Sequence, residues 1–121
     1  MKISITWGGL ELDESGAWNE AYLAGLRGEL LDAEKRGEGC ILEFRLDRES
    51  APPWFRDRMA SFFGDEALQT RFLEAAAHCK RRLKNREALE GWALTPAPGP
   101  GASAFTRRLT ELFDNLTLSD S

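Results

Sequence analysis

The stretch 65-DEALQTRFLEAAAHCKRRLKNREALE-90 carries the clearest structural signal in this 121-residue chain. Its apolar side chains recur at the spacing of one face of an α-helix, and Asp65 offers a carboxylate that can cap the first turn. The apolar positions are Leu68, Phe72, Ala75, Ala76, Cys79 and Leu83. We therefore expect an amphipathic helix of about 66 to 89 that packs one face against a core.

The segment before that helix combines a second long helix with a strand. Apolar residues recurring at about one helical turn predict a helix of about 17 to 36, which Gly37 would end. From Cys40 to Leu46, apolar and polar side chains then alternate, as in a strand with one buried and one largely charged face. A helix that leads into a strand also allows parallel pairing with an earlier strand through a right-handed crossover.

The first twelve residues predict a β-hairpin. Ile3, Ile5 and Trp7 alternate with polar residues, and Gly8-Gly9 accepts the positive φ angles of a two-residue turn. In that register Leu10 and Leu12 would share a face with the first strand. A bulged single strand is the alternative.

The remaining segments are helical or proline-rich. Pro52-Pro53 suits the first turn of a short apolar helix that begins near Trp54 and ends at Gly64. Residues 95–103 contain three prolines and form a linker, and a last amphipathic helix is expected from about 104 to 116. The fold class is therefore α+β, with a small N-terminal hairpin and a third strand packed with about four helices.

The domain organisation has one open alternative at its C-terminal end. We expect a single domain at 1–94, the linker at 95–103, and a helix and tail at 104–121 that dock on the same domain. If the helix does not fold back, its apolar stripe would instead dock in the groove of a partner. That stripe includes Phe105, Leu109 and Phe113.

Side chains suited to catalysis are scarce. The chain has one histidine and two cysteines, and it lacks a phosphate-binding loop or a metal-ligand spacing, so we expect no enzyme, metal or cofactor. His78 flanks the apolar stripe between Glu74 and Arg82 and is expected at the solvent edge, with acid-base catalysis as the alternative. Cys40 and Cys79 are expected as buried thiols, with a disulfide between them as the alternative.

The charge is uneven along the chain. The net charge is −4, and residues 1–51 hold 11 acids and 6 bases, which gives −5 for that part. An acidic first half suits a protein partner with a basic surface and makes nucleic acid an improbable partner. The cations from Lys80 to Arg86 either complement the helix dipole or form an anion-binding patch.

These patterns favour a small acidic protein-binding protein, most concretely an inhibitor or immunity protein that occludes the active site of a toxin or enzyme. The N-terminus lacks a secretion signal and no stretch is long enough to span a membrane, so we expect a cytoplasmic protein with no membrane partner. The alternative is an assembly factor or adaptor that binds through its C-terminal helix. The candidate partner-binding residues are Asp13, Glu14, Glu43, Asp47, Trp54, Phe105, Leu109 and Phe113.

Overall fold

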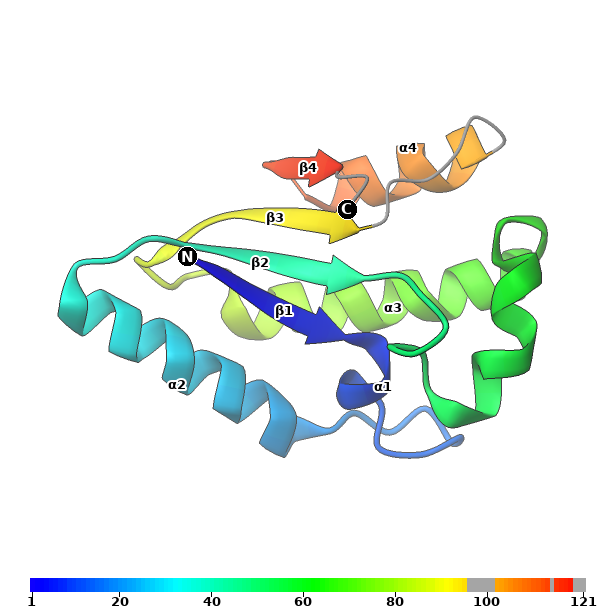
Figure 1. Cartoon of the computed structure of the whole chain (residues 1–121), viewed down its shortest axis with the longest axis horizontal. Coiled ribbons are helices and arrows are strands. Elements are labelled where there is room, and N and C mark those ends of the chain that lie inside the picture. Colours follow the sequence, from blue (N-terminus) through cyan, green and yellow to red (C-terminus); the bar gives the residue numbers. More distant parts are fainter. Residues whose placement is uncertain (96–101, 114, 119–121) are drawn as a thin grey trace.

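Strands and helices alternate along the chain in the computed structural model, which describes residues 1–95, 102–113 and 115–118 (Figure 1). The elements, in order, are β1 (Lys2–Thr6), α1 (Trp7–Leu10), α2 (Glu20–Arg36), β2 (Cys40–Arg45), the 3₁₀ helix η1 (Pro53–Gly64), α3 (Glu66–Leu83), β3 (Leu89–Thr95), α4 (Ser103–Leu112) and β4 (Leu116–Leu118). None of the described helices is long and apolar enough to cross a membrane.

The four strands form one parallel sheet in the order β1-β2-β3-β4. The parallel pairing of β1 with β2 places Ile3 beside Leu42 and Ile5 beside Phe44. The molecule is therefore a mixed α/β structure, and the expected N-terminal hairpin is wrong because every described strand of the sheet runs parallel to its neighbours.

The hairpin fails at its expected turn, where residues 7–10 form a single helical turn instead. The Thr6 side chain caps this turn by accepting a hydrogen bond from the Gly9 amide at 3.1 Å. Neither Gly8 nor Gly9 has a positive φ; a Cβ on Gly9 would instead lie 2.7 Å from the Tyr22 ring. The glycine pair therefore permits close packing, and the chain turns into a helix rather than back along β1.

Two strands are absent from the sequence-based prediction. The helix expected to reach residue 89 ends at Leu83, and Leu89–Thr95 form β3. Residues 91–95 are all buried, so this strand lacks the alternation that identifies a half-buried strand. The short β4 begins at Leu116, the last residue of the expected 104–116 helix, and continues into the expected tail. Within the predicted linker, residues 96–101 fall outside the described part of the chain.

An aromatic core joins the helices to one face of the sheet. Phe72 on α3 makes edge-to-face contacts with Trp7, Phe44 and Phe62, and its ring also lies 6.0 Å from that of Phe105 on α4. The apolar stripe of α4 and the residue after it is thus part of this core: Phe105, Leu109 and Phe113 are all buried. These three candidate partner-binding residues do not form an exposed stripe.

The opposite face of the sheet carries none of the helices of the described residues (Figure 1). Each connection moves the chain by one strand in the same direction, so right-handed crossovers place the connecting helices on one side of the sheet. Polar side chains line the other side, which we call the open face. It consists of Lys2, Ser4 and Thr6 on β1, Ile41, Glu43 and Arg45 on β2, Gly91, Ala93 and Thr95 on β3, and Thr117 on β4.

Candidate functional site

Four of the eight candidate residues lie in connections that leave the carboxyl ends of the strands. Asp13 and Glu14 lie in the connection after β1, and Asp47 and Trp54 lie in the connection after β2. These connections leave the carboxyl ends of parallel strands, the edge at which such sheets bind their ligands. The Gly8 amide donates to the Ser50 carbonyl at 2.7 Å and ties the two connections together.

Residues 11–18 form a closed, hydrogen-bonded loop between α1 and α2. Glu11 and Trp18 pair as an isolated antiparallel bridge, and the Leu12 amide donates to the Ala17 carbonyl at 2.9 Å. Inside the loop, the Asp13 carboxylate accepts from the Ser15 amide at 2.8 Å. Gly16 has a φ of 92°, which favours glycine because it has no Cβ to clash. The side chains of residues 12–14 are all exposed, and we call these three residues the loop tip.

A buried ion pair anchors the start of the loop. The Glu11 carboxylate is fully buried and accepts two hydrogen bonds from Arg71 of α3, at 2.6 and 3.0 Å. Trp7 Nε1 donates to the other carboxylate oxygen. Arg71 also donates to the Glu14 carbonyl at 3.2 Å and lies over the Phe55 ring. One guanidinium thus holds both the base and the tip of the loop.

A stacked aromatic pair anchors the end of the loop. The ring of Trp18 stacks on that of His78, with centroids 4.9 Å apart, and His78 Nε2 lies 2.9 Å from a Glu20 carboxylate oxygen. Desolvation raises the pKa of Glu20, but the hydrogen bond from His78 and the charge of Arg82 outweigh it and leave this pKa lowered. His78 is only 8% exposed, so its expected place at the solvent edge is wrong. Its contacts assign it to positioning Trp18.

The loop tip combines an exposed apolar side chain with two carboxylates. Leu12 is 60% exposed, although the hairpin register would have buried it. Hydrogen bonds from the Ser15 side chain and amide lower the pKa of Asp13 and keep it charged. None of the ion pairs among the described residues uses the carboxylate of Asp13 or Glu14. Both carboxylates are therefore exposed, and the nearby Arg71 guanidinium contacts the Glu14 carbonyl rather than its carboxylate.

The other two acidic candidates are neutralised within the fold. Glu43 is buried on the open face, where it accepts from Thr95 Oγ1 at 2.9 Å and lies 3.4 Å from Lys2 Nζ. Asp47 pairs with Arg45 at 3.1 Å and accepts from the Ser50 amide. Trp54 is half-buried, and its Nε1 has no hydrogen-bond partner among the described residues.

Three cations of the basic cluster from Lys80 to Arg86, at the end of α3 and just beyond it, make contacts within the chain. Lys80 donates to the Leu112 carbonyl and lies over the Phe113 ring, which ties α4 to α3. Arg82 pairs with Glu20, and Arg86 lies 3.8 Å from Glu34. A polar cavity of about 430 Å³ beside the cluster is lined by Lys80, Lys84, Asn85, Leu89, Glu90, Gly91, Trp92 and Asn115.

The described residues form neither a cluster of metal ligands nor a disulfide bond. Among those residues, no three or more His, Cys, Asp and Glu side chains gather in a group that could hold a metal ion. Cys40 and Cys79 are both buried and free, as expected from the sequence.

The comparisons with known proteins establish a likeness of fold alone. Neither a family model nor a curated protein sequence matches the chain. Two solved structures of endo-glycoceramidase II from Rhodococcus sp. match it, one described as a lactosyl-enzyme intermediate and the other as a cellobiose-like imidazole complex. Both have a TM-score of 0.76 and 14% identity over 90% of this chain. The chain covers only 37% and 36% of those two chains, so its fold is similar to one part of a larger protein.

Proposed function

We propose that this protein is an inhibitor that binds a basic enzyme or toxin and occludes its active site, with the tip of the 11–18 loop as the contact. The observation that supports this most is the loop itself: Leu12, Asp13 and Glu14 are exposed on a backbone anchored at both ends. The sequence also favours an inhibitor, and we now assign the contact with the partner to Leu12, Asp13 and Glu14 of this loop.

The anchoring favours binding because the loop loses little conformational freedom when a partner covers it. Each side chain that becomes immobilised on binding weakens the binding free energy by roughly 0.5–1.5 kcal/mol. The backbone of a pre-formed loop loses its conformational entropy during folding, so it adds little to that loss on binding. The Glu11–Arg71 pair and the Trp18–His78 stack supply that rigidity. A partner therefore meets the three tip residues in a fixed arrangement.

The chemistry of the tip indicates what the partner surface must offer. Leu12 needs an apolar pocket, and the two carboxylates need lysine or arginine side chains around that pocket. Because the carboxylates are free of internal ion pairs, they attract a basic partner over long range and accelerate association at low salt. A cytosolic setting is part of this proposal and is supported by the two free thiols.

The adaptor alternative loses its main support in the fold. It required an exposed apolar stripe on α4, whereas Phe105 and Leu109 are buried against the rest of the chain.

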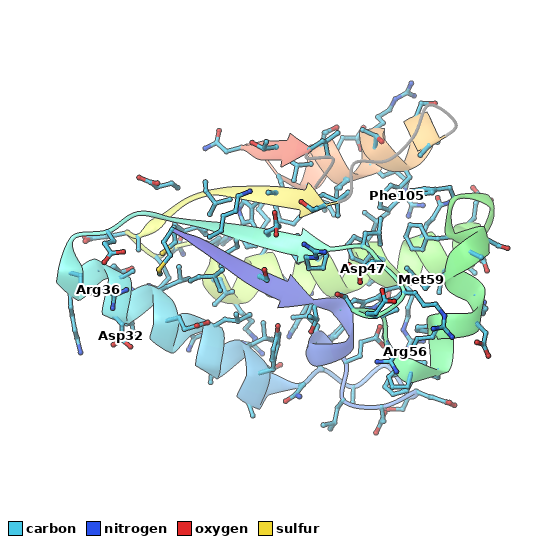
Figure 2. The ribbon with its side chains drawn as sticks, in the orientation of Figure 1. Asp32, Arg36, Asp47, Arg56, Met59 and Phe105 are labelled. Atoms are coloured by element: carbon cyan, nitrogen blue, oxygen red, sulfur yellow. The ribbon has the colours of Figure 1, made fainter. Side chains whose placement is uncertain are left out.

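The experiment compares three tagged baits in an extract of the native cells. They are the unchanged protein, the loop variant Leu12→Ala/Asp13→Lys/Glu14→Lys, and the control variant Glu29→Lys/Leu31→Ala/Asp32→Lys. The control replaces one leucine and two acids at exposed positions on α2. Figure 2 shows Asp32 near one end of α2, far from Asp47 and the connections after the strands.

The proposal predicts one protein retained in stoichiometric amount by the unchanged bait and the control, and lost with the loop variant. Added salt should slow association with the unchanged protein and affect the loop variant much less. Retention of the same partner by all three baits would contradict the assignment to the loop, provided that circular dichroism shows all three folded.

A further inference from the structure

We propose that the polar cavity at the end of α3 binds the phosphate group of a small phosphate monoester. Its volume of about 430 Å³ lies within the range of roughly 300–1,000 Å³ that is typical of small-molecule sites. The cavity lies where α3 ends and where β3 and β4 begin. Because the sheet is parallel, this edge is opposite to the 11–18 loop, and the inference goes beyond the proposed inhibitor function.

The cavity has a buried floor and an exposed polar rim. Gly91 and Trp92 of β3 are buried and form the floor. Lys84, Asn85 and Asn115 are exposed at the rim. A Cβ on Gly91 would lie 3.1 Å from the Asn115 carbonyl oxygen, so glycine allows the residue before β4 to approach β3 this closely. The Trp92 amide donates to the same carbonyl at 2.8 Å and holds it there.

Two lysines bring positive charge to the cavity. Lys80 and Lys84 are four residues apart and therefore lie on the same side of the end of α3. None of the ion pairs among the described residues uses either of them. The Lys80 ammonium donates to the Leu112 carbonyl and lies 5.7 Å from the centre of the Phe113 ring, so it is held in place with two N–H donors to spare.

The acidic residue of the lining, Glu90, directs its carboxylate to the other side of β3. The carboxyl group lies against Gly39, in the space that a Cβ there would occupy. Gly39 precedes β2 and Asn115 precedes β4, and these two strands flank β3 on opposite sides. The lysines therefore keep the cavity cationic, and two ammonium groups match the charge of about −2 that a phosphate monoester carries.

The rest of the lining indicates that a small polar molecule carries the phosphate. A single phosphate group fills only part of the cavity. The side-chain amides of Asn85 and Asn115 can both donate and accept hydrogen bonds, which suits hydroxyl groups beside the phosphate. The net charge of −4 disfavours a polyanion such as nucleic acid, so we assign the site to a small ester rather than to a polymer.

Two-dimensional NMR titrations of the unchanged protein test the site. The probes are inorganic phosphate, glycerol 3-phosphate, glycerol and a single-stranded oligonucleotide, each in about 150 mM NaCl so that weak surface attraction is screened. We expect the amides of Asn85, Gly91 and Asn115 to shift with both phosphates and not with glycerol. Glycerol 3-phosphate should bind more tightly than inorganic phosphate because its hydroxyl groups meet the two asparagines.

A lysine variant assigns the binding to the cavity. Lys84→Gln removes one of the two cations without touching the contacts that hold α4, and it should weaken binding of glycerol 3-phosphate by about tenfold. Lys35→Gln removes an exposed cation on α2 and is the matched control, with unchanged affinity expected.

Four results would overturn the proposal. They are no saturable binding of either phosphate, shifts confined to other residues, equal affinity of Lys84→Gln and the unchanged protein, and an oligonucleotide that binds more tightly than the ester. An ester that binds no more tightly than inorganic phosphate would overturn the assignment to a monoester.

Discussion

Replacement of Arg71 by methionine tests the anchor of the binding loop. The change leaves the Glu11 carboxylate buried with Trp7 Nε1 as its remaining hydrogen-bond donor. Breaking a buried pair in this way costs about 3–5 kcal/mol, and the lower value applies because Arg71 is 27% exposed. With a urea dependence of about 2 kcal/mol per molar, the unfolding midpoint should fall by about 1.5 M.

Urea unfolding followed by circular dichroism measures this loss. Adding Glu11→Gln to Arg71→Met removes the unpaired charge and should restore about 1 kcal/mol or more. Arg36→Met breaks an exposed ion pair with Glu38 and serves as the control, with no change expected in the midpoint. A loss below about 1 kcal/mol for Arg71→Met, or a double variant no more stable than the single one, would refute the buried anchor.

Three further predictions address the core, the start of α3 and the thiols. Phe72→Ala should lower the free energy of unfolding by about 3–5 kcal/mol, because the side chain touches four aromatic rings; a loss below about 2 kcal/mol would contradict this packing. Arg58 and a backbone amide of the first turn lower the pKa of Asp65, so its stabilising effect should be complete above its ordinary pKa of 3.8 and disappear as the pH falls through the lowered value. Asp65→Asn should flatten that part of the stability–pH curve, and an unchanged curve would refute the assignment. Burial raises the pKa of Cys79 to about 12 and also raises that of Cys40, so a thiol reagent should label neither in the folded protein and both in urea. Labelling without unfolding would show that a thiol is accessible.

The sequence predicted the elements whose patterns repeat and missed those whose patterns depend on distant neighbours. Helices α2 and α3 and strand β2 were predicted because apolar side chains recur in each with a regular period, although α3 ends six residues before the expected 89. β3 was missed because burial on both faces removes its alternation. The predicted hairpin was wrong because the Gly8-Gly9 pair is compatible with a hairpin turn and with a helical turn. The helical turn forms because Gly9 packs against Tyr22 and the Gly8 amide bonds to the Ser50 carbonyl.

The candidate site was predicted in part for the same reason. Asp13 and Glu14 stood out as acids, whereas Leu12 was assigned to the core by the incorrect hairpin. Arg71 lies 60 residues from Glu11, so no local pattern could pair them. The sequence indicates that Glu43 and Asp47 are available to a partner, whereas the folded chain places Lys2 and Thr95 beside Glu43 and Arg45 beside Asp47. How exposed a charged side chain is depends on tertiary neighbours that the sequence does not reveal.

Hydrogen–deuterium exchange on the complex with the captured partner tests the central claim most directly. The amides of residues 12–16 should exchange more slowly in the complex than in the free protein, while those of the control segment 29–32 should not change. Slower exchange confined to other surfaces, with residues 12–16 unaffected, would contradict the proposal that this loop is the binding site.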